Sequence, residues 1–417
     1  MNQTDNISAS AFASLALPAP PEPLSVPPKP LSFFSIPLHW NAKTAYDDLP
    51  PFLFRVSHPK SFARLGGGWA LSRDASSPDN YESSRLGLGP RSNEEVAAAL
   101  NRHLWWLDTE PGHSNFVSWT TSLLFALKFA FCNKQQGTPS ECIRLCMVNT
   151  QKFPKGVFVR DIYLIGAYKH YLPTYEQRVS GDGKTLTSLL DLRTQGLYFG
   201  EFLSQGALGI DGKSCIVSLS DLEDRGLLWL LPELDAHDKE LQLARRVLNE
   251  RTKWLADDWM KWSDVPLSPR LPVDLGRLVD LFEPDFRLAA ATALLSLEPR
   301  DPRDHGLMWD MVQVVTRYPD DATLKHYYSR QHTDDLEMPE VNQYSTIITN
   351  LAIILERRKE LLVSIRPATA LTQTDPQVEA ESAQGSMAVW EEAWRRAYPD
   401  LKKKVVGSGG LLSFSRR

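Results

Sequence analysis

One segment of this 417-residue chain groups hydroxyl side chains at a change of pattern. In Phe116–Ser122 an apolar pair leads into Ser, Trp, Thr, Thr and Ser, and apolar residues then recur at helical spacing. The pattern predicts a strand, a polar corner and a helix. Hydroxyl groups at a strand end can hydrogen-bond a ligand, and Thr121 or Ser122 can equally cap the helix. The corner alone leaves a binding role and a structural role open.

An arginine interrupts the apolar run from Phe52 to Val56, which is otherwise typical of a buried strand. Burying an unpaired guanidinium is costly, so Arg55 needs an anion or several hydrogen-bond acceptors. Phosphate is a natural partner, because its oxygens match the planar guanidinium. A carboxylate of the protein's own fold is the alternative, and the sequence leaves both open.

A single carboxylate, Glu201, stands among the aromatic and aliphatic residues of the predicted strand 196–208. A carboxylate in an apolar strand has a raised pKa or a dedicated partner, and this is one signature of a catalytic group. A glutamate that faces water from an edge strand produces the same pattern. Both interpretations stay open for Glu201.

Two other motifs are rejected as ligand sites. Gly212-Lys213-Ser214 ends like a nucleotide-triphosphate loop, but Ala207 replaces the required glycine and Cys215–Leu219 continues as a strand. Cys142 and Cys146 lack the paired spacing of a zinc site, so we expect both to be buried as small apolar side chains.

Composition and charge narrow the class of protein. The net charge of −5 and the pI near 6.0 disfavour broad binding to nucleic acid or anionic membranes. No window of about 18 apolar residues could span a bilayer, and no secretory signal is recognisable. The 4 cysteines suit a reducing compartment. We therefore expect a cytoplasmic or nuclear protein.

The elements that position these residues form a predicted α+β domain over residues 46–224. Besides the segments above, the pattern predicts a helix at 92–100, strands at 142–148 and 156–163, and a polar loop at 173–195. The tryptophan pair Trp105 and Trp106 is expected to pack.

The rest of the chain has a different character. Residues 1–45 read as a disordered proline-rich leader, and 225–365 as a helical region that packs on the first domain or recruits a partner. Residues 366–417 read as a linker, a short helix and a basic tail.

Arginine on a first strand, a hydroxyl corner before a helix, and glutamate on a late strand together resemble the ADP-ribosyltransferase family of the Arg-Ser-Glu type, found in cholera-like toxins and arginine-specific transferases. Phe54–Val56 looks like the family's arginine strand, and Phe116–Thr120 is similar to its Ser-Thr-Ser strand, with Ser118 at the leading serine. Glu201–Gly206 looks like its catalytic segment. The resemblance covers about residues 50–220. This stretch also resembles an uncharacterised domain recurrent in filamentous fungal proteins.

The resemblance implies split antiparallel sheets with flanking helices, followed here by a mostly helical C-terminal region. It also implies NAD as a substrate. Glu201 would steady the positive charge that develops on the ribose as nicotinamide leaves, and would grip a ribose hydroxyl. Arg55 would hold the pyrophosphate, and Ser118 would orient Glu201 and the nicotinamide.

Three further residues are expected to contact NAD. Trp119 and Tyr198 are the candidates for stacking on the nicotinamide ring, and Thr120 directly follows Trp119 in its motif. Trp119 stands where the family has Thr, and Phe199 stands where arginine-modifying members carry Glu or Gln. The loop at 173–195 would present the acceptor.

Two hypotheses follow from the resemblance. The first is NAD-dependent ADP-ribosyl transfer to an unknown protein or small-molecule acceptor, or NAD glycohydrolysis. The second is a catalytically inactive interaction module in which the helical region binds a partner.

Overall fold

The computed structural model describes residues 29–33, 46, 49–61, 63–107, 114–179, 183–235, 242–254, 271–300, 311 and 338–365. Most of the predicted leader lies outside these residues, as do the predicted linker, short helix and basic tail beyond residue 365.

The first half of the chain is built on a six-stranded antiparallel sheet with the strand order β6-β7-β4-β1-β5-β9. Its strands are β1 (Phe52–Ser57), β4 (Phe116–Thr120), β5 (Arg144–Asn149), β6 (Val159–Arg160), β7 (Glu201–Gln205) and β9 (Ser214–Ser218). A second, three-stranded sheet consists of β2 (Arg64–Gly66), β3 (Trp69–Leu71) and β8 (Ala207–Gly209).

The pairing between the two central strands of the large sheet is short. β1 pairs with β5 along its whole length, but with β4 only through Phe54 and Thr120. β4 in turn pairs with β7 along its whole length, which places Thr120 opposite Glu201. The sheet therefore parts between β1 and β4 beyond this single residue pair.

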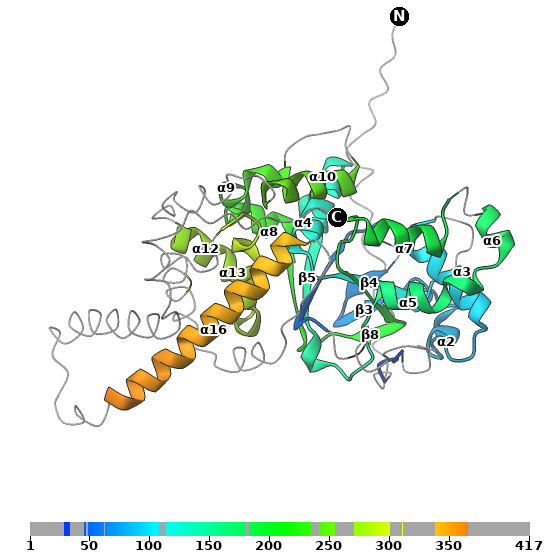
Figure 1. Ribbon diagram of the computed structural model, residues 1–417, viewed down its shortest axis with the longest axis horizontal. Helices are drawn as coiled ribbons and strands as arrows, with labels where there is room; N and C mark the ends of the chain where they lie inside the picture. The colour runs from blue at the N-terminus through cyan, green and yellow to red at the C-terminus, as the bar shows by residue number, and fades with distance from the viewer. Residues whose placement is uncertain are drawn as a thin grey trace, which may run out of the picture.

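Two groups of helices pack on the same face of this sheet. In the view of Figure 1 the two groups appear on opposite sides of the strands. The first half contains α2 (Tyr81–Ser84), α3 (Asn93–Leu104), α4 (Leu123–Gln135), α5 (Asp161–Tyr168), α6 (Thr174–Val179) and α7 (Leu186–Thr194). Helices α3, α5 and α7 share a core with Phe116 and Leu203, whereas α4 packs on Phe52, Phe54 and Val56 of β1. Residues on the other face of the sheet, such as Leu53 and Trp119, pack towards the small sheet.

The second half is helical among its described residues. It contains α8 (Leu219–Asp224), α9 (Leu227–Leu230), α10 (Leu243–Arg251), α12 (Leu271–Val279), α13 (Pro284–Leu295) and α16 (Pro339–Ile365). Short 3-10 turns occur at Ser140–Cys142, Thr150–Lys152, Lys169–Tyr171, Pro232–Asp235 and Thr252–Trp254. Buried residues of α13 and α16 belong to the same core as β1 and α4, so one core crosses the predicted boundary at residue 225. None of the described helices is long and apolar enough to cross a membrane.

Three expectations need correction. The predicted strand at 156–163 is extended only at Val159–Arg160, because α5 begins at Asp161. The predicted loop at 173–195 contains α6 and α7; Thr185 and Ser188 form a capping box for α7, whose Leu186 and Leu189 are buried. Cys142 is exposed instead of buried.

Candidate functional site

Arg55, Ser118 and Glu201 lie on three neighbouring strands, β1, β4 and β7, close to where β1 and β4 part. The Nη1 atom of Arg55 donates a hydrogen bond of 2.6 Å to the backbone oxygen of Ser118. Glu201 is the first residue of β7 and lies opposite Thr120, two residues along β4 from Ser118. We call this place the candidate site.

Arg55 is a half-buried cation that contacts no carboxylate among the described residues. Its hydrogen-bond partners are two backbone carbonyls, Ser118 O at 2.6 Å and Ala63 O at 3.1 Å, and its buried Nε has no partner among the described residues. Burial lowers the pKa of Arg55 to about 10, while Cys146 and Glu201 act in the opposite direction. The guanidinium therefore stays charged at neutral pH. Among the described residues, the alternative of a salt bridge within the protein's own fold therefore finds no support.

Glu201 has a dedicated cationic partner. Arg193 of α7 donates through Nη2 to Glu201 Oε2 at 2.6 Å, and its Nε lies 3.1 Å from Asp161 Oδ2. Burial raises the pKa of Asp161 to about 7; Arg193 lowers it and Glu201 raises it. The Glu201 side chain is 14% exposed, and β7 lies between β6 and β4, so the edge-strand interpretation is wrong. A carboxylate oriented in this way can act on a ligand only through its remaining oxygen or by leaving Arg193.

The hydroxyl of Ser118 is held by a histidine from α3. His103 Nε2 lies 2.8 Å from Ser118 Oγ, and Nδ1 lies 2.8 Å from Ser114 Oγ. Burial, together with the smaller effect of the Arg55 charge, lowers the pKa of His103 to about 3. The imidazole is therefore neutral at physiological pH, so one ring nitrogen donates and the other accepts. No carboxylate contacts the ring among the described residues, so it orients Ser118 instead of activating it as a nucleophile.

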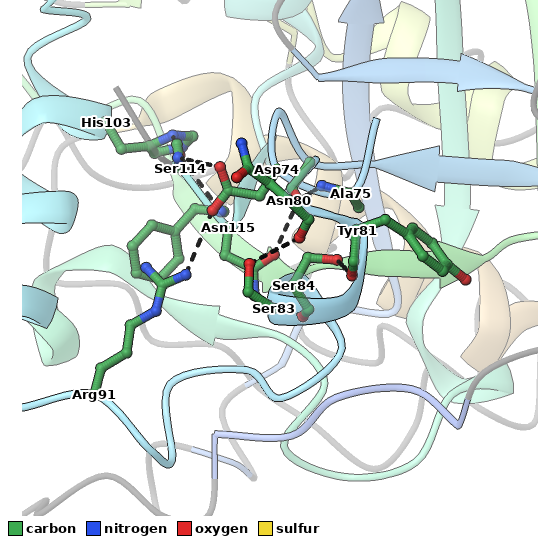
Figure 2. A network of polar contacts seen from close by, with 12 residues as sticks. Asp74, Ala75, Asn80, Tyr81, Ser83, Ser84, Arg91, His103, Ser114 and Asn115 are labelled. Carbon is green, nitrogen blue, oxygen red and sulfur yellow. Dashed lines mark hydrogen bonds and ion pairs between the residues drawn. The ribbon is translucent and has the colours of Figure 1, made fainter. Parts of the chain in front are cut away.

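A polar network anchors the other end of this histidine (Figure 2). The backbone N–H of Ser114 donates to Asp74 Oδ1 at 3.0 Å, and Arg91 forms an ion pair with Asp74 at 3.4 Å. The neighbouring Asn115 donates to the backbone oxygen of Ser84 at 2.9 Å. These contacts fix the segment that leads into β4, and with it the position of Ser118.

The structure does not support the stacking role expected of Trp119 and Tyr198. Both side chains are only 1% exposed. Trp119 points into the core between the two sheets, where its Nε1 donates to Ser204 Oγ at 2.9 Å. The hydroxyl of Tyr198 accepts a hydrogen bond of 3.0 Å from Arg160 Nε. Neither ring has a face open to a ligand, but Trp119 does not fill the candidate site either.

The hydroxyls of the corner are mostly used within the fold. Thr120 donates to the backbone oxygen of Phe199 at 2.5 Å and accepts from Ser122 N at 3.0 Å. Ser122 caps α4 by accepting from Phe125 N at 3.1 Å, as its sequence position allowed. Thr120 therefore supports the backbone beside Glu201, and its expected contact with NAD gains no support from this geometry.

Gly200 allows this corner and the start of β7 to come together. Its φ of +67° is left-handed, and a Cβ at this position would lie 1.9 Å from Thr121 Oγ1. The backbone N–H of Thr121 also donates to Gly200 O at 2.9 Å. No residue with a side chain fits directly before Glu201 without displacing Thr121.

Residues of α16 and α10 form hydrogen bonds with the corner and with the segment that precedes Glu201. Ser122 Oγ donates to Glu340 Oε1 of α16 at 2.7 Å. Arg251, at the end of α10, donates through Nη2 to the same oxygen at 2.7 Å and through Nη1 to Tyr198 O at 2.7 Å. Glu340 and Arg251 are buried, at 2% and 4% exposure. The segment that leads to Glu201 is thus bound to helices far along the chain.

Sequence reasoning missed three residues that shape the candidate site: His103, Asp161 and Arg193. His103 lies just beyond the helix predicted at 92–100, with no motif around it, Asp161 lies in a predicted strand, and Arg193 in a predicted loop. No signal in a single sequence pointed to them, because their roles depend on how α3, α5 and α7 pack on the sheet. The described residues include no group of three His, Cys, Asp or Glu side chains that could hold a metal ion.

Fold and site together define a mixed α+β protein with antiparallel sheets and a helical C-terminal region. A family model described as a domain of unknown function, DUF7587, matches residues 48–187. That range includes Arg55, His103 and Ser118, and it ends before Arg193 and Glu201. Neither the curated proteins nor the solved structures contain a significant match to the chain.

Proposed function

We propose that this protein uses NAD as a substrate, in ADP-ribosyl transfer to an unidentified acceptor or in NAD glycohydrolysis. The observation that carries the proposal is the meeting of Arg55, Ser118 and Glu201 on three neighbouring strands. A cation that has no carboxylate partner among the described residues suits a pyrophosphate, and a nearby carboxylate suits a ribose that becomes positively charged. The short β1–β4 pairing also supports an ADP-ribosyltransferase-like division of the sheets, which belongs to the same proposal.

Each of the three residues has a distinct role in this proposal. NAD supplies a ribose C1′ bond to nicotinamide whose cleavage leaves positive charge on the sugar. Glu201, oriented by Arg193, would lie beside that charge and stabilise it. Arg55 would bind the phosphates, and Ser118, positioned by His103, would orient the ligand.

A second candidate function is a non-enzymatic interaction module. It is favoured by the pairing of Glu201 Oε2 with Arg193 at 2.6 Å, which gives the carboxylate a purely structural use. Phe199, buried and stacked on Phe125, also offers no polar group to an acceptor. In this case the helical second half would provide the binding surface. A cytoplasmic or nuclear location stays a prediction under both functions.

The discriminating experiment measures nicotinamide released from NAD by the full chain, with and without added acceptor extracts. We expect release by the wild type and at least about a 100-fold lower rate for Glu201→Gln, because the neutral amide cannot balance the developing charge. Glu223→Gln is the matched control: this glutamate forms an ion pair with Lys134, away from the candidate site.

Glu223→Gln should keep the wild-type rate, and thermal melting should show that all three proteins are folded. If the folded wild type releases no nicotinamide under any of these conditions, or if Glu201→Gln matches it, the enzymatic proposal is wrong and the interaction module stands.

A further inference from the structure

A row of aromatic side chains runs along α4 towards Glu201. It consists of Trp106, Phe129, Phe125 and Phe199, and we call it the aromatic row. The ring centroids are 5.8 Å apart for Trp106 and Phe129, 6.4 Å for Phe129 and Phe125, and 5.0 Å for Phe125 and Phe199. Its inner end, Phe199, lies two residues before Glu201.

The outer end of the row is open to solvent. The Trp106 side chain is 61% exposed, whereas Phe125 and Phe129 are half-buried and Phe199 is 7% exposed. Trp106 also has a φ of +52°, and it is the only non-glycine residue with positive φ in the described part of the chain. A left-handed backbone is strained for a bulky residue. The backbone is thus strained at a tryptophan that contacts Phe129, as packing would require, but stays mostly exposed.

The row contacts a histidine that feels the charge of Arg55. His58, three residues after Arg55, packs edge-on against Phe129 with centroids 6.1 Å apart. Burial lowers the pKa of His58, and the charges of Lys60 and Arg55 lower it further. On the other side, Trp106 follows His103 by three residues, and His103 also feels the charge of Arg55. His58 therefore contacts the row at Phe129 and lies within electrostatic reach of Arg55, a cation without a carboxylate partner among the described residues.

We propose that the aromatic row is a stacking platform for the planar base of a nucleotide whose phosphate binds Arg55. The inference rests on the proposed function in naming a nucleotide, and it assigns the stacking role that the buried Trp119 and Tyr198 cannot fill. Aromatic faces bind any base, and a guanidinium binds its phosphate. The net charge of −5 favours a mononucleotide or dinucleotide over a nucleic-acid strand.

The test compares AMP with ribose 5-phosphate by calorimetric titration of the full chain. Both ligands carry the phosphate, but only AMP carries a base. Stacking on an aromatic side chain contributes about 1–3 kcal/mol, so AMP should bind about tenfold more tightly or better. Trp106→Ala and Phe125→Leu should reduce the affinity for AMP towards that for ribose 5-phosphate. Arg55→Lys should weaken the binding of both ligands.

Trp229→Ala is the matched control, because Trp229 is another tryptophan with 76% exposure and lies on α9, outside the row. It should leave AMP binding unchanged. Equal wild-type affinities for AMP and ribose 5-phosphate would overturn the platform, as would unchanged AMP binding in Trp106→Ala. Tighter binding of a ten-nucleotide thymidine strand than of AMP would replace the small ligand with nucleic acid.

The two proposals fail separately. Base-dependent AMP binding without nicotinamide release would leave the platform in place and remove the enzymatic function. Nicotinamide release without a preference for AMP over ribose 5-phosphate would remove only the platform.

Discussion

At the scale of single residues, Gly200 sets how closely the start of β7 approaches the corner between β4 and α4. The backbone of Gly200 is left-handed, and the hydroxyl of Thr121 lies close to where a Cβ would be. Gly137 has the same kind of backbone, with φ +88°, but no atom lies within 4 Å of its Cβ position. Substitutions at the two glycines therefore distinguish the cost of backbone strain, which both share, from the cost of a steric clash, which arises only at Gly200.

We predict that Gly200→Ala lowers the free energy of unfolding more than Gly137→Ala does. Both variants carry a strain of about 1–2 kcal/mol, and Gly200→Ala adds about 1–3 kcal/mol for overpacking against Thr121. Urea denaturation followed by circular dichroism measures the difference. Adding Thr121→Ala to Gly200→Ala should restore part of the loss. Equal losses in the two single variants would show that the corner is not tightly packed.

The residue types predicted part of the candidate site. A charged side chain in an apolar strand must be satisfied, and this pointed correctly to Arg55 and Glu201 as residues with special surroundings. The exposure of an aromatic side chain could not be predicted from its residue type, because it depends on the layers that pack above and below its strand. Trp119 and Tyr198 were therefore expected in the open and are buried, whereas Trp106, expected to pack, contacts Phe129 but is mostly exposed.

At the scale of elements, the start of α4 is joined to α10 and α16 by a buried ion pair. Ser122 and Arg251 both bind Glu340, which leaves neither hydrogen-bonding side chain facing solvent. Removing one member of such a group leaves a buried charge without a partner, whereas removing an exposed charge does not.

We predict that Glu340→Ala lowers the free energy of unfolding by about 3–5 kcal/mol. Glu82→Ala is the control, since its ion pair with Arg85 is exposed, and it should change stability by at most about 1 kcal/mol. Denaturant titration measures both variants. A double variant, Arg251→Met with Glu340→Leu, should recover part of the loss because no charge is left unpaired. A loss for Glu340→Ala no larger than that for Glu82→Ala would refute the argument.

Elements with a strong local pattern were predictable, and those defined by tertiary contacts were not. The apolar runs of β1 and β4 and the helical periodicity of α4, α13 and α16 all appear in the structure as strands and helices. α7 was missed because its polar sequence resembles a loop. Its helical structure depends on the packing of its leucines on the core. The proposed NAD chemistry rested on a family resemblance and stays a prediction.

At the scale of the whole molecule, the two predicted regions share a single hydrophobic core. Phe52 of β1 packs edge-on against Phe286 of α13 with centroids 5.8 Å apart. Ile347 and Leu351 of α16 belong to the same buried cluster as Leu127 of α4. The change in sequence character near residue 225 thus marks a change of secondary structure, and the core continues across it.

We predict that residues 46–224 expressed alone do not unfold cooperatively, because the outer face of α4 and one face of β1 lose their cover. The full chain should melt in a single transition. Calorimetry and binding of a hydrophobic dye compare the two proteins, and supplying residues 225–417 as a separate chain should reduce dye binding. A sharp transition in the isolated fragment would show that the first region is an independent domain.

The bond between Ser122 and Glu340 also has a consequence for biosynthesis, since 218 positions separate the two residues along the chain. A ribosome that adds about 5–20 residues per second delivers the acceptor roughly ten to forty seconds after the donor. During that interval the nascent sheet carries an uncovered apolar face and a corner without its final partners. Chaperone dependence should therefore be greatest before α16 has been translated.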